Sequence, residues 1–301
     1  MGDAIVKSFL YAFRQLRTLK IRLHPLFFLL MLVAVVVGLW LEALLLFTFV
    51  ILHELGHVIA AKYVGYDIES VTLYPFGGAA RLAYGNIGFQ PTQEAFIAVA
   101  GPLVNLILAC MALGLHWAGG LSDFWFGRVV ELNSWIVLFN MLPGLPLDGG
   151  RILRAAQTRK TGYETATREA YRVSLWIATG LLITGAVSLW AGYPHLGTLI
   201  LGVFLFLSAW VGRREVAADT VRFLDAKRRT KGHPEPVRSI AAPVNSTVRD
   251  VVRQFAPDRY HLVYVRNQDG GIIAVIEENE LLEAVFHGNW LDSLEHWTKR
   301  E

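Results

Sequence analysis

Long apolar stretches alternate with short polar segments along the first two thirds of the chain. A helix needs about 20 residues to cross the ~30 Å hydrocarbon core of a bilayer. Six stretches approach that length and predict membrane-spanning helices, at about Phe27–Trp40, Leu41–Val64, Glu94–Trp117, Val129–Pro146, Val173–Ala191 and Leu196–Val211. The pattern therefore predicts an α-helical polytopic membrane protein.

Two segments beside these spans follow other patterns. Residues 1–22 interleave basic and apolar residues at helical spacing, which predicts an amphipathic segment at a membrane surface. Two β-prone runs, Ile68–Tyr74 and Ala79–Tyr84, flank a Pro/Gly turn and predict a short membrane-associated β-hairpin. Nonhelical backbone at membrane depth must be covered by protein or line a wet cavity. An edge strand there could pair with an unwound substrate segment.

The composition changes after Arg213. A charged helix and a linker follow, and then the pattern of a soluble α/β domain. The chain therefore divides into four predicted parts, residues 1–22, 23–213, 214–236 and 237–301. Within the last part we predict a helix capped by Ser246-Thr247 and ending at Phe255, strands at His261–Val265 and Ile272–Ile276, and a helix at Glu278–Phe286.

Composition and charge narrow the class of protein. Hydrophobic residues make up 54% of the chain and charged residues 18%, with a mean hydropathy of +0.41, which is too apolar for an ordinary soluble protein. The net charge of +3 gives no indication of a nucleic-acid partner. Cys110 is the only cysteine, which excludes an internal disulfide.

The basic residues orient the predicted spans. With six spans, most Lys and Arg clusters fall on one side of the membrane: the N-terminal segment, Lys62, the Arg151–Arg172 cluster and Arg213-Arg214. The positive-inside rule then predicts that both termini are cytoplasmic.

The second span contains His53-Glu54-Leu55-Gly56-His57. Residues i and i+4 share one face of a helix, so the two imidazoles could bind one metal ion. Glu54 lies beside them and could act on a metal-bound water. Ionisable side chains within a span are energetically costly and are functional by default. The motif therefore predicts a zinc site with His53 and His57 as ligands.

A catalytic zinc usually has three protein ligands and a water. The fourth apolar segment ends in a stretch, Asn140–Arg151, that is broken by prolines and glycines. Asp148 is its only acidic residue, and a carboxylate buried there needs a cation. Asp148 is therefore the predicted third ligand; the alternative is a cap on a short helix at Gly149-Gly150.

Two amides are further candidates. We favour Asn140 as a hydrogen-bond donor near the metal water over a packing role in its helix. Asn105 is evenly balanced between packing between helices and function.

Together these motifs resemble the site-2 protease family of intramembrane zinc metalloproteases. The resemblance rests on His53–His57, Phe76-Gly77-Gly78, Ala100–Asn105 and Asn140…Asp148-Gly149, and it covers about residues 20–215. The arrangement with His24-Pro25, six spans and a C-terminal module resembles the stage IV sporulation protein FB branch. Residues 237–290 resemble a single cystathionine-β-synthase (CBS) type module.

The resemblance implies a role for each residue of the motifs. His53, His57 and Asp148 would bind one zinc ion, and Glu54 would be the general base. Asn140 would hold the attacking water or the developing oxyanion. Phe76, Gly77 and Gly78 would contact the substrate.

The same branch implies partners and a location. The substrate would be a membrane-associated pro-sigma-K factor, and the inhibitors would be membrane proteins of the bypass-of-forespore A and stage IV sporulation protein FA type. ATP could bind the CBS-like domain, which could also pair in a homo-oligomer. The expected location is the mother-cell membrane around the forespore.

Two other classes of function compete with an intramembrane protease. A metal transporter should carry polar residues through several spans, whereas Trp176–Leu189 and Leu199–Val211 carry almost none. A noncatalytic zinc scaffold has no need of Glu54, which is present. A site-2 protease with a different regulatory substrate stays open.

Overall fold

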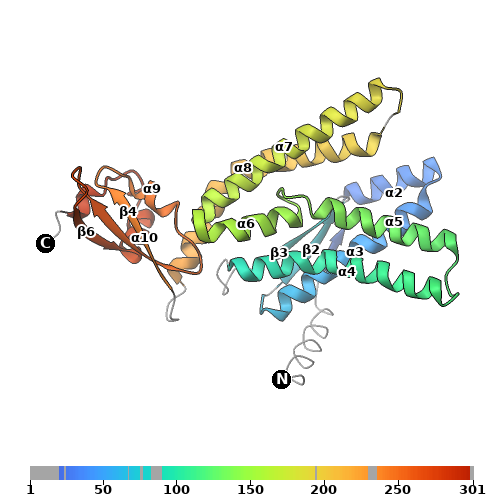
Figure 1. The fold of residues 1–301 in the computed structure, drawn as a ribbon, viewed down its shortest axis with the longest axis horizontal. Coiled ribbons are helices and arrows are strands. Elements are labelled where there is room, and N and C mark those ends of the chain that lie inside the picture. The colour runs from blue at the N-terminus through green and yellow to red at the C-terminus, as the bar shows by residue number, and fades with distance from the viewer. Residues whose placement is uncertain are drawn as a thin grey trace, which may run out of the picture. The chain divides into compact units, whose positions relative to one another are not determined.

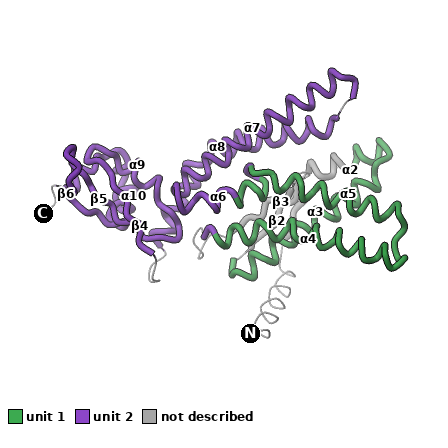
Figure 2. Tube along the Cα trace, in the orientation of Figure 1, with its two compact units in different colours: residues 1–87, 92–143, 147–152 green, residues 88–91, 144–146, 153–301 purple. Residues whose placement is uncertain are grey.

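The computed structural model describes residues 20–23, 25–66, 68–74, 77–82, 90–193, 195–229 and 236–298, with backbone alone for 20–30 and 68–82. The chain forms two compact units (Figure 2). Unit 1 comprises residues 1–87, 92–143 and 147–152, and unit 2 comprises residues 88–91, 144–146 and 153–301. Helix α6 (Asp148–Thr161) begins in unit 1 and ends in unit 2.

Unit 1 is built on four further helices, α2 (Pro25–Val37), α3 (Trp40–Tyr63), α4 (Pro91–Trp117) and α5 (Asp123–Asn140). Helices α2 and α3 meet at Gly38, whose φ of +84° is in the left-handed region that favours glycine. Helices α3 and α4 cross closely at Gly56, where a Cβ would lie 2.8 Å from the Ala100 carbonyl oxygen. A small residue at this crossing lets the backbones of two apolar helices approach each other.

A three-stranded sheet completes unit 1. The predicted hairpin is present as antiparallel β2 (Ile68–Tyr74) and β3 (Gly77–Leu82). Strand β1 (Lys20–Leu23) pairs in parallel with β2. The prediction of an amphipathic segment through residue 22 is therefore wrong for its last residues, and its first 19 residues lie outside the described residues, as does Phe76 in the predicted turn.

Unit 2 contains a helical hairpin of α7 (Tyr163–Trp190) and α8 (Leu196–Arg229), which lie side by side (Figure 1). Helix α8 joins the predicted sixth span and the predicted charged helix without a break. The change in composition after Arg213 therefore does not end the helix, since charged residues such as Arg and Glu are good helix formers.

Four of the described helices, α3, α4, α7 and α8, are long and apolar enough to cross a membrane. The predicted count of six spans is not confirmed. Helix α2 has 13 residues and α5 has 18. At ~1.5 Å per residue, α2 is about 20 Å long, which is shorter than a ~30 Å core. Helix α5 contains Asp123, Arg128 and Glu131, which lower its hydropathy.

The C-terminal module is an α/β unit with strand order β4-β5-β6 (Figure 1). Its strands are β4 (Val237–Pro243), β5 (Tyr260–Arg266) and β6 (Ile272–Glu277), and its helices are α9 (Val248–Val252), α10 (Glu278–Phe286) and α11 (Glu295–Thr298). Thr247 and Asp250 form a capping box at α9, as the sequence indicated for this helix start. Strand β4 was not predicted, and the CBS identity of the module is not confirmed.

The core of this module includes residues of the helical hairpin. Tyr163 of α7 and Phe223 and Leu224 of α8 are buried in one cluster with module residues such as Phe255 and Val263. The Tyr163 and Phe223 rings stack with centroids 4.8 Å apart. The module and the ends of α7 and α8 therefore share one hydrophobic core.

A buried polar cluster joins α8 to the module. Lys227 Nζ lies 3.1 Å from Glu278 Oε1, and His261 Nδ1 lies 2.6 Å from Glu278 Oε2. Burial lowers the pKa of His261 below its ordinary value, although Glu278 acts in the opposite direction. A neutral ring fits the contact on its other side, where Nε2 accepts from the Ala256 N–H at 3.2 Å.

We expect Phe223→Ala to destabilise the C-terminal module by about 3–5 kcal/mol, because it leaves a cavity in the shared core. Thermal unfolding of the full-length protein in detergent, together with protease sensitivity of residues 237–298, measures the effect. The control is Val221→Ala on the same helix, where the side chain is 39% exposed and the expected cost is below about 1 kcal/mol. Equal stability of the two variants would contradict the shared core.

Candidate metal centre

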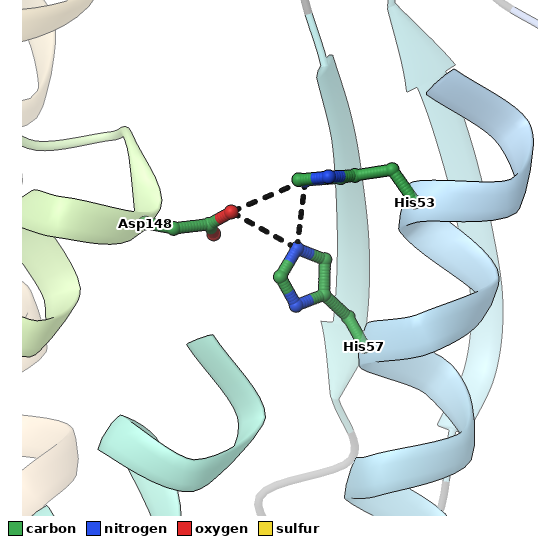
Figure 3. Close-up of side chains that lie close together, drawn as sticks. All are labelled: His53, His57 and Asp148. Carbon is green, nitrogen blue, oxygen red and sulfur yellow. Dashed lines mark hydrogen bonds and ion pairs between the residues drawn. The ribbon is translucent and has the colours of Figure 1, made fainter. Parts of the chain in front are cut away.

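Helix α3 places His53 and His57 one turn apart on the same face. Their Nε2 atoms are 3.1 Å apart, and their rings meet edge to face. Asp148 is the first residue of α6, and its Oδ2 lies 3.1 Å from each Nε2. Figure 3 shows the three side chains pointing toward one another. The structure therefore brings together the three predicted ligands, and all three are buried.

These three atoms fit a zinc ion. Zinc in proteins prefers tetrahedral sites with imidazole nitrogen and carboxylate oxygen at ~2.0–2.2 Å, which sets neighbouring ligand atoms roughly 3.3 Å apart. The three 3.1 Å separations are close to this spacing. Two imidazoles and one carboxylate also match the donor set of known catalytic zinc sites.

The outer nitrogens of both rings have acceptors. His57 Nδ1 lies 2.7 Å from the Ile97 carbonyl oxygen, which can only accept, so Nδ1 must carry the proton. His53 Nδ1 lies 2.7 Å from Asn105 Oδ1. If both rings donate from Nδ1, two nitrogen lone pairs and a carboxylate converge. Such an arrangement is repulsive unless a cation lies among them.

Gly101 of α4 leaves space beside the two Nε2 atoms. A Cβ built there would lie 2.8 Å from His53 Nε2 and closer still to His57 Nε2. Any other residue would fill the space that a bound metal needs. The glycine is therefore explained by the metal centre rather than by helix packing.

Asp148 reaches the histidines because α6 begins close to the end of α5. A Cβ at Gly149 would lie 2.5 Å from the Leu142 carbonyl oxygen and would also clash with that of Met141, so only glycine allows this approach. The carboxylate is at a helix N-terminus, whose dipole stabilises negative charge. The contacts of Asp148 with both histidines favour the ligand role over the alternative of a cap alone.

The remaining predicted site residues lie as follows. Glu54 is buried, 8% exposed, and directly follows His53 on α3. Asn140 is the last residue of α5, and its amide donates to the Ile136 carbonyl oxygen of the same helix at 3.0 Å. Gly77 and Gly78 begin β3 and pair with Tyr74 and Leu73 of β2. The roles predicted for Asn140 and for these glycines stay predictions.

The structure also identifies amides that the sequence left open or missed. Asn105, evenly balanced on sequence alone, is fully buried and contacts His53. Asn133 of α5 is fully buried and accepts a 2.8 Å hydrogen bond from Asn105. Asn133 was not singled out, and the only available signal was an amide in an otherwise apolar segment.

Known proteins resemble this chain. Residues 41–120 match peptidase family M50. The chain is 28% identical over 271 residues to stage IV sporulation protein FB of Bacillus subtilis, an overlap that covers 89% of this chain and 92% of that protein. It is 32% identical over 197 residues to a zinc metalloprotease of Methanocaldococcus jannaschii, which covers 64% of this chain.

A solved structure supports the same relationship. The site-2 protease from Methanocaldococcus jannaschii superposes with a TM-score of 0.55 at 30% identity, over 65% of this chain and 92% of that one. The chain spans about half of the full archaeal zinc metalloprotease, 55% of its length.

We expect Gly101→Ala to abolish metal binding, because the methyl group takes the place of the ion. The loss of zinc affinity should exceed the roughly 10–100-fold that removal of an outer contact causes. Chelator competition and zinc content of the purified full-length protein measure it.

The control for this experiment is Gly114→Ala on the same helix, where a Cβ meets nothing within 4 Å. We expect it to bind zinc as the wild type does. Retention of normal zinc affinity by Gly101→Ala would contradict the location of the metal centre.

Proposed function

We propose that this chain, which belongs to peptidase family M50, is a zinc metalloendopeptidase that cleaves a membrane-associated substrate within the membrane. The observation that carries the proposal is the buried triangle of His53, His57 and Asp148 beside Glu54 on an apolar helix. Such a group is costly in a membrane, and zinc would relieve the cost while supplying the chemistry.

The proposed mechanism divides the work between the ion and the chain. Zinc, when bound, is a Lewis acid that polarises a carbonyl and lowers the pKa of water to about 7. Glu54 accepts a proton from the attacking water and later donates it to the leaving amine nitrogen. Asn140 donates to the water or to the oxyanion. His53, His57 and Asp148 hold the ion.

The depth of the site supports cleavage within the membrane. Trp40 begins α3 and Trp117 ends α4, and both are exposed, as interfacial tryptophans are. His53 is about 20 Å along α3 from Trp40, and Gly101 is about 24 Å along α4 from Trp117. In a ~30 Å core the site then lies nearer the opposite face, where α3 ends beside Lys62.

The chain is an integral membrane protein, with at least four helices suited to span. We propose that the face beside Lys62 is cytoplasmic and that both termini lie there. The basic ends of the spanning helices support this, since Lys62 is in the last turn of α3 and α8 ends in the basic run Lys227–Arg229. Water and an unwound substrate would then enter from the cytoplasm, and strand β3 with Phe76, Gly77 and Gly78 would contact the substrate.

For the substrate we propose a pro-sigma-K-like factor in a sporulating cell. Similarity to stage IV sporulation protein FB over 92% of that protein supports this choice. The relatives are varied, however, and include a putative zinc metalloprotease of Mycobacterium tuberculosis at 31% identity. A different regulatory substrate is therefore the alternative within the family.

The remaining proposals concern regulation in that setting. They are inhibition by membrane proteins of the bypass-of-forespore A and stage IV sporulation protein FA type, ATP binding by the C-terminal module, and pairing of two modules. The location would be the mother-cell membrane around the forespore. Continuity of similarity through the C-terminal module supports carrying them over from that branch.

We expect Glu54→Gln to abolish cleavage of a membrane-embedded test substrate while zinc stays bound, because the amide cannot accept the proton. Loss should be at least about 100-fold, the lower range for general-base catalysis. The control is Glu42→Gln, the same exchange at the other end of α3, where Glu42 forms a part-exposed ion pair with Arg128 at 3.6 Å. Full activity in Glu54→Gln would refute the mechanism, and a noncatalytic scaffold predicts no cleavage by the wild type either.

Co-expression tests the substrate. We expect the wild type, and not Glu54→Gln, to shorten a membrane-associated pro-sigma-K-like protein, with ATP changing the rate in purified membranes. Immunoblots of the substrate measure both effects. Cleavage of a generic membrane substrate without processing of pro-sigma-K would favour the alternative substrate.

A further inference from the structure

A chain of buried amides runs from His53 across two further helices. Asn105 Oδ1 of α4 lies 2.7 Å from His53 Nδ1. Asn105 Nδ2 donates to Asn133 Oδ1 of α5 at 2.8 Å, and Asn133 Nδ2 donates to the Val129 carbonyl oxygen at 2.8 Å. Asn105 and Asn133 are 0% exposed and His53 is 2% exposed. Solvent therefore does not compete for these contacts.

The last acceptor fixes the direction of every bond. A backbone carbonyl oxygen can only accept, so the Asn133 atom that faces Val129 must be the NH₂ group. The Asn133 oxygen then faces Asn105 and must accept from its NH₂ group. This leaves the Asn105 oxygen toward His53, which can only accept. His53 must therefore donate from Nδ1, and its lone pair is on Nε2.

The two histidines reach this state by different routes. His57 donates directly to the Ile97 carbonyl oxygen, which is itself an acceptor only. His53 contacts a side-chain amide, which can present either its oxygen or its NH₂ group. Without Asn133, nothing in the contact between His53 and Asn105 selects the orientation that frees Nε2. The tautomer of His53 therefore depends on a residue that does not touch it.

We propose that Asn133 is a positioning residue of the metal centre, which acts through Asn105 to keep the lone pair of His53 on Nε2 and so sets the affinity for zinc. The inference rests on the proposed zinc site but not on proteolysis. Outer contacts of ligating histidines are typically worth about 10–100-fold in metal affinity. We expect Asn133→Leu to weaken zinc binding by a factor in this range.

A double-mutant cycle separates the relay from simple damage to packing. Asn105→Asp gives His53 an acceptor in either orientation, so the orientation no longer has to be selected. We expect Asn133→Leu to weaken zinc binding about 10–100-fold in the wild-type background and less than about threefold in the Asn105→Asp background. Chelator competition on the full-length protein in detergent measures affinity, and the visible spectrum of the cobalt(II) form reports the ligand set.

Asn133→Asp guards against a misfolded variant. In its neutral form, which burial favours, aspartic acid has one O–H donor for Val129 and one acceptor for Asn105. We expect it to retain zinc affinity within about threefold. Equal losses from Asn133→Leu in both backgrounds, or loss in Asn133→Asp equal to that in Asn133→Leu, would overturn the inference.

The outcomes also separate this inference from the proposed function. A wild type that binds zinc and cleaves substrate, with unchanged affinity in Asn133→Leu, would refute the relay alone. A wild type that binds no zinc through His53, His57 and Asp148 would refute both.

Discussion

Electrostatic repulsion at one buried point governs the construction of unit 1. Two imidazole nitrogens and a carboxylate oxygen lie 3.1 Å from one another in an apolar helical setting. Only a cation makes this arrangement favourable, so the fold must keep the ligands together and also keep the space for the ion. Gly101 preserves that space, and Gly149 lets the chain that bears Asp148 return to it. The glycines and the ligands are parts of one solution.

The low dielectric of the surroundings strengthens each polar contact in this solution. A buried amide or imidazole without a partner costs about 1–3 kcal/mol, so each polar group near the site needs a defined partner. Hydrogen bonds from His57 to Ile97 and from Asn105 to Asn133 meet this need and link α3, α4 and α5. The network that orients the ligands thus also contributes to the packing of the helices.

The sequence predicted the metal centre better than it predicted the fold. His53 and His57 followed from helical spacing, and Asp148 from being the only acid in a broken apolar stretch. Asn133 could not be predicted, because its role depends on a contact with Asn105 that is 28 residues distant. Strand β1 likewise depends on pairing with β2, and its four residues have no pattern of their own. Hydropathy overcounted spans because it did not weigh the short α2 or the charges in α5.

The shared core of Tyr163, Phe223, Leu224 and the C-terminal module has a consequence for how such proteins can evolve. A domain with its own core can be gained, lost or exchanged between genes as a cassette. This module cannot be, because part of its core is encoded within α7 and α8. A gene cut short before residue 237 would leave Phe223 and Leu224 without their packing partners, and cellular quality control removes such chains. Inheritance of the module is thereby tied to inheritance of the helical hairpin.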